Sequence, residues 1–127
     1  MAAINADQTV RRFVASGERG DVDEVLDFFT EDAVWHPMPY KNPAVGKPAL
    51  RQAISEWLRG AEQLGVVIHV QISDGKIVMH ERTDRFFLKG QEHAMPIAAV
   101  FEIENGRIAA WREYFDMSQI AWTSPES

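Results

Sequence analysis

The sequence predicts an α+β fold in which helices pack on one face of a strongly curved, mixed but mostly antiparallel sheet. Apolar residues recur with a helical period of about 3.6 up to Gly65 and with the strand period of 2 after it. Three short turn sequences then separate long strand-like stretches, as in a meander: Ser73-Asp74-Gly75, Lys89-Gly90 and Glu104-Asn105-Gly106. The chain has 127 residues, so we expect residues 1–127 to form a single domain.

The first half of the chain is predicted to be mainly helical. Three segments have apolar residues at helical spacing: 7–16, 21–29 and 48–65. The first and third end near a glycine, and the apolar residues of the second form one stripe that is expected to be buried. Gly17 is the expected stop of the first. Asp21 and Glu24 have the spacing of a capping box at the start of the second. Residues 33–37 are predicted to form a short strand, and residues 38–46, which contain prolines, a loop.

The second half is predicted to form four strands, at 66–72, 76–88, 92–103 and 107–116. In the first of them, alternation places Val66, Ile68, Val70 and Ile72 on one face and His69 and Gln71 on the other. No structure is assigned to the tail after Ser118, and we expect residues 125–127 to be frayed.

Two of these strands carry charged side chains on faces that are otherwise apolar. His80, Arg82 and Asp84 lie on the same face as Val78 and Phe86, because side chains alternate along a strand. In the last strand a single carboxylate, Glu113, lies between Trp111 and Phe115. Such a pattern is typical of a lined pocket rather than of a solvated edge. The expected lining residues are apolar: Val78, Phe86, Met95, Ile97, Trp111 and Phe115.

An arginine between two carboxylates has a chemical use. If the strands are neighbours, Arg82 can pair with Glu113 as well as with Asp84, and its planar fork can orient both. Burial and like charge then push the two carboxyl pKa values apart, so that one serves as acid and the other as base. The alternative interpretation is a structural ion pair at the sheet margin. For His80, a structural role in the core is the alternative to a role in the site.

Composition excludes several classes of function. The net charge is −6 and the 13 basic residues are scattered, which argues against a nucleic-acid surface. There is no cysteine, and His36, His69 and His93 lack metal-ligand spacing, so we assign no metal and no cofactor. We expect no membrane partner, since no apolar run approaches about 20 residues, and a cytoplasmic location as the default.

The segments Glu81-Arg82-Thr83-Asp84, 100–108 and Trp111-Arg112-Glu113-Tyr114-Phe115-Asp116 resemble the limonene-1,2-epoxide hydrolase family. That family belongs to the nuclear-transport-factor-2-like superfamily, with the polyketide cyclases and ketosteroid isomerases. The resemblance covers most of the chain. It implies a cone-shaped (cystatin-like) fold of three helices and a curved sheet that encloses a pocket.

The resemblance also implies residue roles. Asp84 would be the acid, Arg82 the bridging arginine and Glu113 the base that activates water, although the family pattern has Asp at this last position. The family holds its water with a Tyr and an Asn, and the matching positions here are Trp35 and Pro37. The remaining candidates for positioning the water are Tyr40, Asn42, Trp35, His36 and His80.

The implied activity is a cofactor-free epoxide hydrolase that converts a small lipophilic epoxide to a vicinal diol in one step. Two alternatives stay open: an isomerase or cyclase of the ketosteroid isomerase or SnoaL type that uses the same site, and a protein that binds a lipophilic ligand or a protein partner without catalysis. We also expect a homodimer through the outer sheet face, because the apolar side chains expected there need cover: Ala94, Pro96, Ala98, Val100, Ile108, Ala110 and Tyr114.

Overall fold

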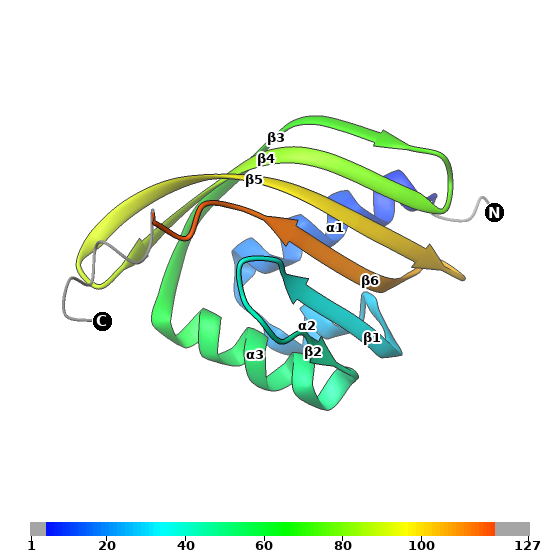
Figure 1. Cartoon of the computed structure of the whole chain (residues 1–127), viewed down its shortest axis with the longest axis horizontal. Helices are drawn as coiled ribbons and strands as arrows, with labels where there is room; N and C mark the ends of the chain where they lie inside the picture. Colours follow the sequence, from blue (N-terminus) through cyan, green and yellow to red (C-terminus); the bar gives the residue numbers. More distant parts are fainter. Residues whose placement is uncertain (1–4, 119–127) are drawn as a thin grey trace.

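A computed structural model describes residues 5–118 as three helices on an open, strongly curved sheet (Figure 1). The helices are α1 (Ala6–Arg19), α2 (Val22–Leu26) and α3 (Lys47–Gly60). The strands are β1 (Phe29–Pro37), β2 (Ala44–Val45), β3 (Ala61–Ser73), β4 (Ile77–Leu88), β5 (Gln91–Glu104) and β6 (Arg107–Tyr114). This is the predicted α+β fold. The expectation for residues 125–127 lies outside the described residues.

The six strands form one mixed sheet in the order β2-β1-β6-β5-β4-β3. The four long strands at one side are antiparallel, which confirms the predicted meander. β1 returns to pair with β6 in parallel, and β2 lies antiparallel to β1 inside the segment predicted to be a loop. In Figure 1 the sheet arches over the helices, which all lie on its concave side. None of the described helices is long and apolar enough to cross a membrane.

Capping decides where the first two helices begin and end. Asn5 and Gln8 form a capping box at the start of α1. The helix runs past the predicted stop at Gly17 and ends at Gly20, whose φ of 76° is the left-handed conformation that glycine adopts at low cost. Asp21 caps α2 as expected, but the carboxylate of Glu24 pairs with Arg19 instead of completing a capping box.

Strand β3 differs from its prediction in two ways. It begins at Ala61 rather than near residue 66, because α3 ends at Gly60. A β-bulge between Ile68 and Val70 then inserts one extra residue and reverses the alternation. Gln71 therefore faces the interior and Ile72 is 64% exposed, the opposite of what strict alternation predicts.

A bulge between β5 and β6 corrects the assignment of Ile108. Ile103 pairs with Ile108 whereas Glu102 pairs with Ala110, so Ala109 is the extra residue. Ile108 consequently turns inward and is fully buried, although alternation placed it on the outer face. Tyr114 is exposed on the outer face, as expected.

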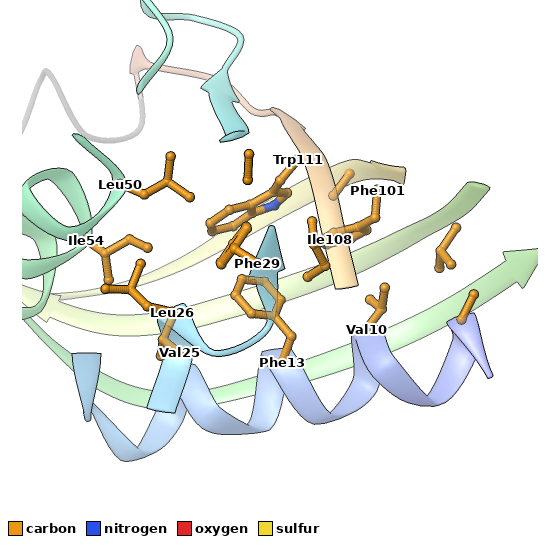
Figure 2. Close-up of a cluster of buried hydrophobic side chains, with 14 residues drawn as sticks. Val10, Phe13, Val25, Leu26, Phe29, Leu50, Ile54, Phe101, Ile108 and Trp111 are labelled. Atoms are coloured by element: carbon orange, nitrogen blue, oxygen red, sulfur yellow. The ribbon is translucent and has the colours of Figure 1, made fainter. Parts of the chain in front are cut away.

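The main core lies between α1, α3 and the middle of the sheet (Figure 2). Phe13 of α1 packs edge-on against Phe29, Phe101 and Trp111, with ring centroids 4.8–5.9 Å apart. These contacts fix β1, β5 and β6 against the first helix, and they place Trp111 at the boundary between the core and the cavity described below.

Candidate active site

Arg82 lies at the centre of a buried cluster of polar side chains. Its Nε donates to Oδ1 of Asp84 at 2.8 Å and its Nη2 donates to Oδ2 at 3.2 Å, which is the bidentate geometry of a strong arginine–carboxylate pair. Nη2 also donates to Oε2 of Glu113. The structure therefore brings together the three residues that the sequence singled out, with the guanidinium joining the two carboxylates.

Arg82 and Glu113 make contact although their strands are not neighbours, which was the condition attached to this pairing in the sequence. Strand β5 lies between β4 and β6. Ala99 of β5 is paired with both His80 and Glu113. Neighbouring strands are about 4.8 Å apart, so the contact spans roughly two such spacings. The long arginine side chain therefore reaches across the intervening strand to Glu113.

Glu113 has a second donor that the sequence did not predict in this role. The indole Nε1 of Trp35 donates to Oε1 of Glu113 at 3.0 Å. Parallel pairing of β1 with β6 sets this contact, because it places Trp35 beside Trp111 and Pro37 beside Glu113. Trp35 also stacks on Trp111, with ring centroids 4.6 Å apart and planes 9° from parallel. Both oxygens of Glu113 thus accept hydrogen bonds, which is the arrangement of an ionised carboxylate.

The electrostatics of the cluster are dominated by burial. The side chains of Arg82 and Glu113 are 6% and 7% exposed, and that of Asp84 is 17% exposed. Burial raises the pKa of Glu113 above the usual value for a glutamate, and it outweighs the opposing effect of Arg82. Burial alone would lower the pKa of Arg82, but the negative charges of Glu113 and Asp84 have the larger combined effect and raise it. The guanidinium therefore stays charged. The cluster is a fixed cation between two carboxyl groups, one of which has a raised proton affinity.

The cluster opens into a cavity of about 760 Å³ between the sheet and helix α3. Its wall is mostly apolar; the charged residues in it are Arg82, Asp84, Glu113, Lys41 and Glu56. Five of the expected apolar residues line it: Phe86, Met95, Ile97 and Trp111 in the sheet, and Phe115 directly after β6. Val78 was also expected there but belongs to the main core cluster instead, where it is fully buried.

Helix α3 supplies the wall of the cavity opposite the sheet. From the sequence, the apolar face of this helix was predicted only to be buried in the core. Trp57 packs edge-on against Phe86 with ring centroids 5.0 Å apart, and Ile54 and Leu58 lie on the same side of the helix. Their helical spacing fitted a buried stripe equally well. These side chains line a cavity because the curved sheet leaves a space next to this face of α3.

The candidates for positioning water lie in different places. Tyr40, Asn42 and Trp35 line the cavity together with Glu113. Tyr40 is 48% exposed, and its ring lies 6.5 Å from that of Phe115. His36 and His80 lie outside the set of described residues that line the cavity. A ring nitrogen of His36 is 3.0 Å from the backbone oxygen of Tyr40.

The described residues contain no group of three or more histidine and carboxylate side chains that could hold a metal ion. The site consists of an arginine, two carboxyl groups and an indole at one end of an apolar cavity. The fold and the site together define a small α+β domain of the nuclear-transport-factor-2-like class with an acid–arginine–acid cluster.

Comparison with known proteins identifies the family. Residues 4–124 match the model of the limonene-1,2-epoxide hydrolase catalytic domain, and the chain belongs to this family. A curated relative, epoxide hydrolase EphG of Mycobacterium tuberculosis strain H37Rv, is 28% identical over 108 residues, which cover 85% of this chain and 71% of the relative.

Solved structures agree with this assignment. A structure of an epoxide hydrolase of the same type from M. tuberculosis is 25% identical, with a TM-score of 0.76 over 92% of this chain and 93% of that one. A putative isomerase from Bacillus subtilis has a TM-score of 0.85 at 20% identity, over 96% of this chain and 94% of that one. At that identity the second likeness shows the fold alone.

Proposed function

We propose that this protein is a cofactor-independent epoxide hydrolase that adds water to a small lipophilic epoxide and releases a vicinal diol. The observation that carries the proposal is the position of Arg82, which joins Asp84 and Glu113 at the wall of an otherwise apolar cavity. Opening an epoxide with water requires a base for the attacking water and an acid for the leaving oxygen. Two oriented carboxyl groups that share one proton meet both requirements, one as the acid and the other as the base.

Glu113 is the base in this mechanism. Both of its oxygens accept hydrogen bonds, from Trp35 and from Arg82, and these bonds favour its ionised form and offset part of the effect of burial. Its raised pKa makes it a stronger base than an ordinary glutamate, because a base accepts a proton more readily as its pKa approaches the working pH. As water attacks an epoxide carbon, its proton passes to Glu113.

Asp84 is the acid. A single positive charge on Arg82 balances one carboxylate, so protonation of the second carboxyl group leaves the trio neutral. Asp84 is the less buried of the two carboxyl groups, and it lines the cavity. Its proton passes to the epoxide oxygen as the C–O bond breaks. The return of one proton from Glu113 through solvent to Asp84 then completes the cycle, with no covalent intermediate.

The cavity sets the class of substrate. Aromatic and aliphatic side chains from β4, β5, β6 and α3 surround the cluster, and no lysine or arginine other than Lys41 and Arg82 lines the cavity among the described residues. A volume of about 760 Å³ lies in the usual range for small-molecule sites. A compact apolar epoxide fits these walls better than a charged metabolite does.

Tyr40 and Asn42 are proposed to hold the attacking water. Both line the cavity, as Trp35 and Glu113 do, and both carry oxygens that can accept a hydrogen bond from water. Trp35 can only donate, and its N–H already bonds to Glu113. If the proposal is correct, Tyr40→Phe or Asn42→Ala will reduce kcat, whereas Lys76→Ala, a change at an exposed residue that does not line the cavity, will not.

A panel of small apolar epoxides, with diol formation followed by mass, tests the proposal directly. Hydration of at least one epoxide at a rate above the background, lost in Glu113→Gln, is the expected result. Deuterium exchange at carbon without hydration would replace the hydrolase by an isomerase that uses the same carboxyl groups next to a carbonyl. Tight binding without turnover of any epoxide or enone would leave a binding protein.

A further inference from the structure

A chain of hydrogen bonds leads from Arg82 away from the cavity to the first helix. Nη1 of Arg82 lies 3.0 Å from Nε2 of His80, and Nδ1 of His80 lies 2.9 Å from Oε1 of Gln71. The side-chain nitrogen of Gln71 donates to Asp7 at two atoms, Oδ1 at 2.7 Å and the backbone oxygen at 3.1 Å. The chain thus connects β4, β3 and α1. His80 and Gln71 both lie outside the described residues that line the cavity.

The chemistry of the partners fixes the direction of every bond in this chain. An arginine has no acceptor, so Nη1 donates and Nε2 of His80 accepts with its lone pair. A neutral imidazole then carries its proton on Nδ1, which donates to the amide oxygen of Gln71. The amide nitrogen is left to donate, and Asp7 accepts. No donor faces a donor, so the chain is satisfied in a single arrangement.

His80 must be neutral for this arrangement. It is 5% exposed and packs edge-on against Phe101, with ring centroids 5.1 Å apart. Burial lowers its pKa to about 3, and the positive charges of Arg82 and Arg11 contribute in the same direction. At neutral pH the ring is therefore an acceptor for Arg82 and not a competing cation.

We propose that His80 and Gln71 are positioning residues that hold the Arg82 guanidinium in the orientation in which it bridges Asp84 and Glu113; the catalytic consequence rests on the proposed function. These hydrogen bonds occupy four of the five guanidinium N–H groups: two on Asp84, one on Glu113 and one on His80. These partners lie on different sides of the planar group. Without His80, Nη1 loses its acceptor in a buried place, and the group can turn toward the carboxylates.

A turned guanidinium would change how the acid and the base face each other across the substrate. Reaction rates depend steeply on such geometry, and a displacement of about 1 Å can cost up to roughly 100-fold. Because His80 does not line the cavity, its loss should leave substrate binding nearly unaffected. A lower kcat with an unchanged KM is therefore the expected signature.

The kinetic experiment compares two substitutions of His80 with one control. His80→Phe keeps a ring against Phe101 but removes the acceptor, whereas His80→Gln places an amide oxygen near the position of Nε2. We expect kcat to fall about 10- to 100-fold in His80→Phe with KM within about twofold, and His80→Gln to recover most of the loss. Leu26→Ala makes a cavity beside α2, a helix that carries none of the residues of this chain of bonds, and should lower stability but leave kcat near wild type. A folded His80→Phe with wild-type kcat would overturn the proposal, as would equal kcat losses in both variants.

A second experiment, nitrogen NMR of the Arg82 guanidinium, needs neither enzymatic activity nor a folded His80 variant. Rotation about the Cζ–Nε bond of arginine averages the two Nη signals in nitrogen NMR unless the guanidinium is held. We expect separate Nη1 and Nη2 signals for Arg82 and a ring proton on Nδ1 of His80 in the wild type. Gln71→Leu, which keeps His80 but leaves Nδ1 without its acceptor, should shift the ring signals and broaden those of Arg82. Unchanged Arg82 signals in Gln71→Leu would contradict the proposal. A wild type that hydrates no epoxide but shows the held guanidinium would refute the proposed function alone.

Discussion

Trp35 and Glu113 are 78 residues apart in sequence and share a hydrogen bond of 3.0 Å from the indole nitrogen to Oε1 of the carboxylate. The bond exists because β1 crosses to pair in parallel with β6. It gives Glu113 a donor on the oxygen that Arg82 does not use. Trp35 thereby helps to stabilise the negative charge of the proposed base and opposes the effect of burial on its pKa.

Replacement of Trp35 by Phe tests this relationship. Phe keeps an aromatic ring against Trp111 but removes the N–H, so the pKa of Glu113 should rise further. A hydrogen bond to a charged group contributes about 1.5–3 kcal/mol, so we expect the acid limb of the kcat/KM profile to move up by about one pH unit or more. An acid limb that stays in place would show that this bond does not tune the base.

Replacement of Glu113 by Gln separates a catalytic from a structural role. The change keeps size and removes the base, and we expect kcat to fall by roughly 10²–10⁴-fold while the melting temperature stays close to wild type. Glu102→Gln is the matched control, because Glu102 lies on the outer face of the adjacent strand and pairs with Arg112 at 2.6 Å. A structural ion pair would give the reverse pattern, with a stability loss of about 3–5 kcal/mol and near-normal turnover.

Replacement of Asp84 by Asn removes the proton that the leaving oxygen needs, and should reduce kcat by a similar factor. Since the two carboxyl groups act as a unit, the Asp84→Asn/Glu113→Gln double variant should lose little more than the worse single variant. Steady-state kinetics on purified, folded proteins checks this. Losses that multiply would indicate two independent contributions.

The raised pKa of Glu113 predicts opposite effects of pH on rate and on stability. Native Glu113 binds a proton more tightly than unfolded Glu113, whose pKa is near 4.5, the usual value for a glutamate, so folding takes up a proton in the interval between the two values. The stability of the wild type relative to Glu113→Gln should therefore increase as the pH falls from 7.5 to about 5, while kcat/KM decreases. Urea unfolding at the two pH values measures this difference. A stability difference that is constant or reversed would show that Glu113 has no raised pKa.

We predict a homodimer that forms through the outer face of the sheet. Val67, Val70 and Ile72 of β3 are 55–64% exposed, and Met79 of β4 lies beside Ile72. The described helices cover only the concave side of the sheet (Figure 1). Light scattering at micromolar concentration should give twice the 14.4 kDa of one chain, and Val70→Lys should give the monomer. A wild type that elutes as a clean monomer would exclude the dimer.

Local patterns in the sequence predicted much of the fold and the central part of the site. The change of period near Gly65 located the sheet, and the turn sequences separated its long strands. Alternation placed Arg82, Asp84 and Glu113 on the inner face, because no bulge interrupts β4 or the end of β6. The placement of the charged residues was therefore a local property of each strand.

The remainder depends on features without a local signal. The bulges near His69 and Ala109 turned Gln71 and Ile108 inward, and an extra residue in a strand leaves no mark on an apolar pattern. The Trp35–Glu113 contact requires a parallel crossover from β1 to β6. For the same reason the link from His80 to Gln71 and Asp7 could not be predicted, since it crosses three elements.

A single turnover of an apolar epoxide in ¹⁸O-labelled water, with enzyme in excess, tests the one-step mechanism most directly. If water activated by Glu113 attacks the epoxide carbon, the first diol formed will carry one labelled oxygen. If a carboxylate attacked instead, the first turnover would place an unlabelled oxygen from Asp84 or Glu113 in the diol, and label would appear only later. An unlabelled first product would contradict the account.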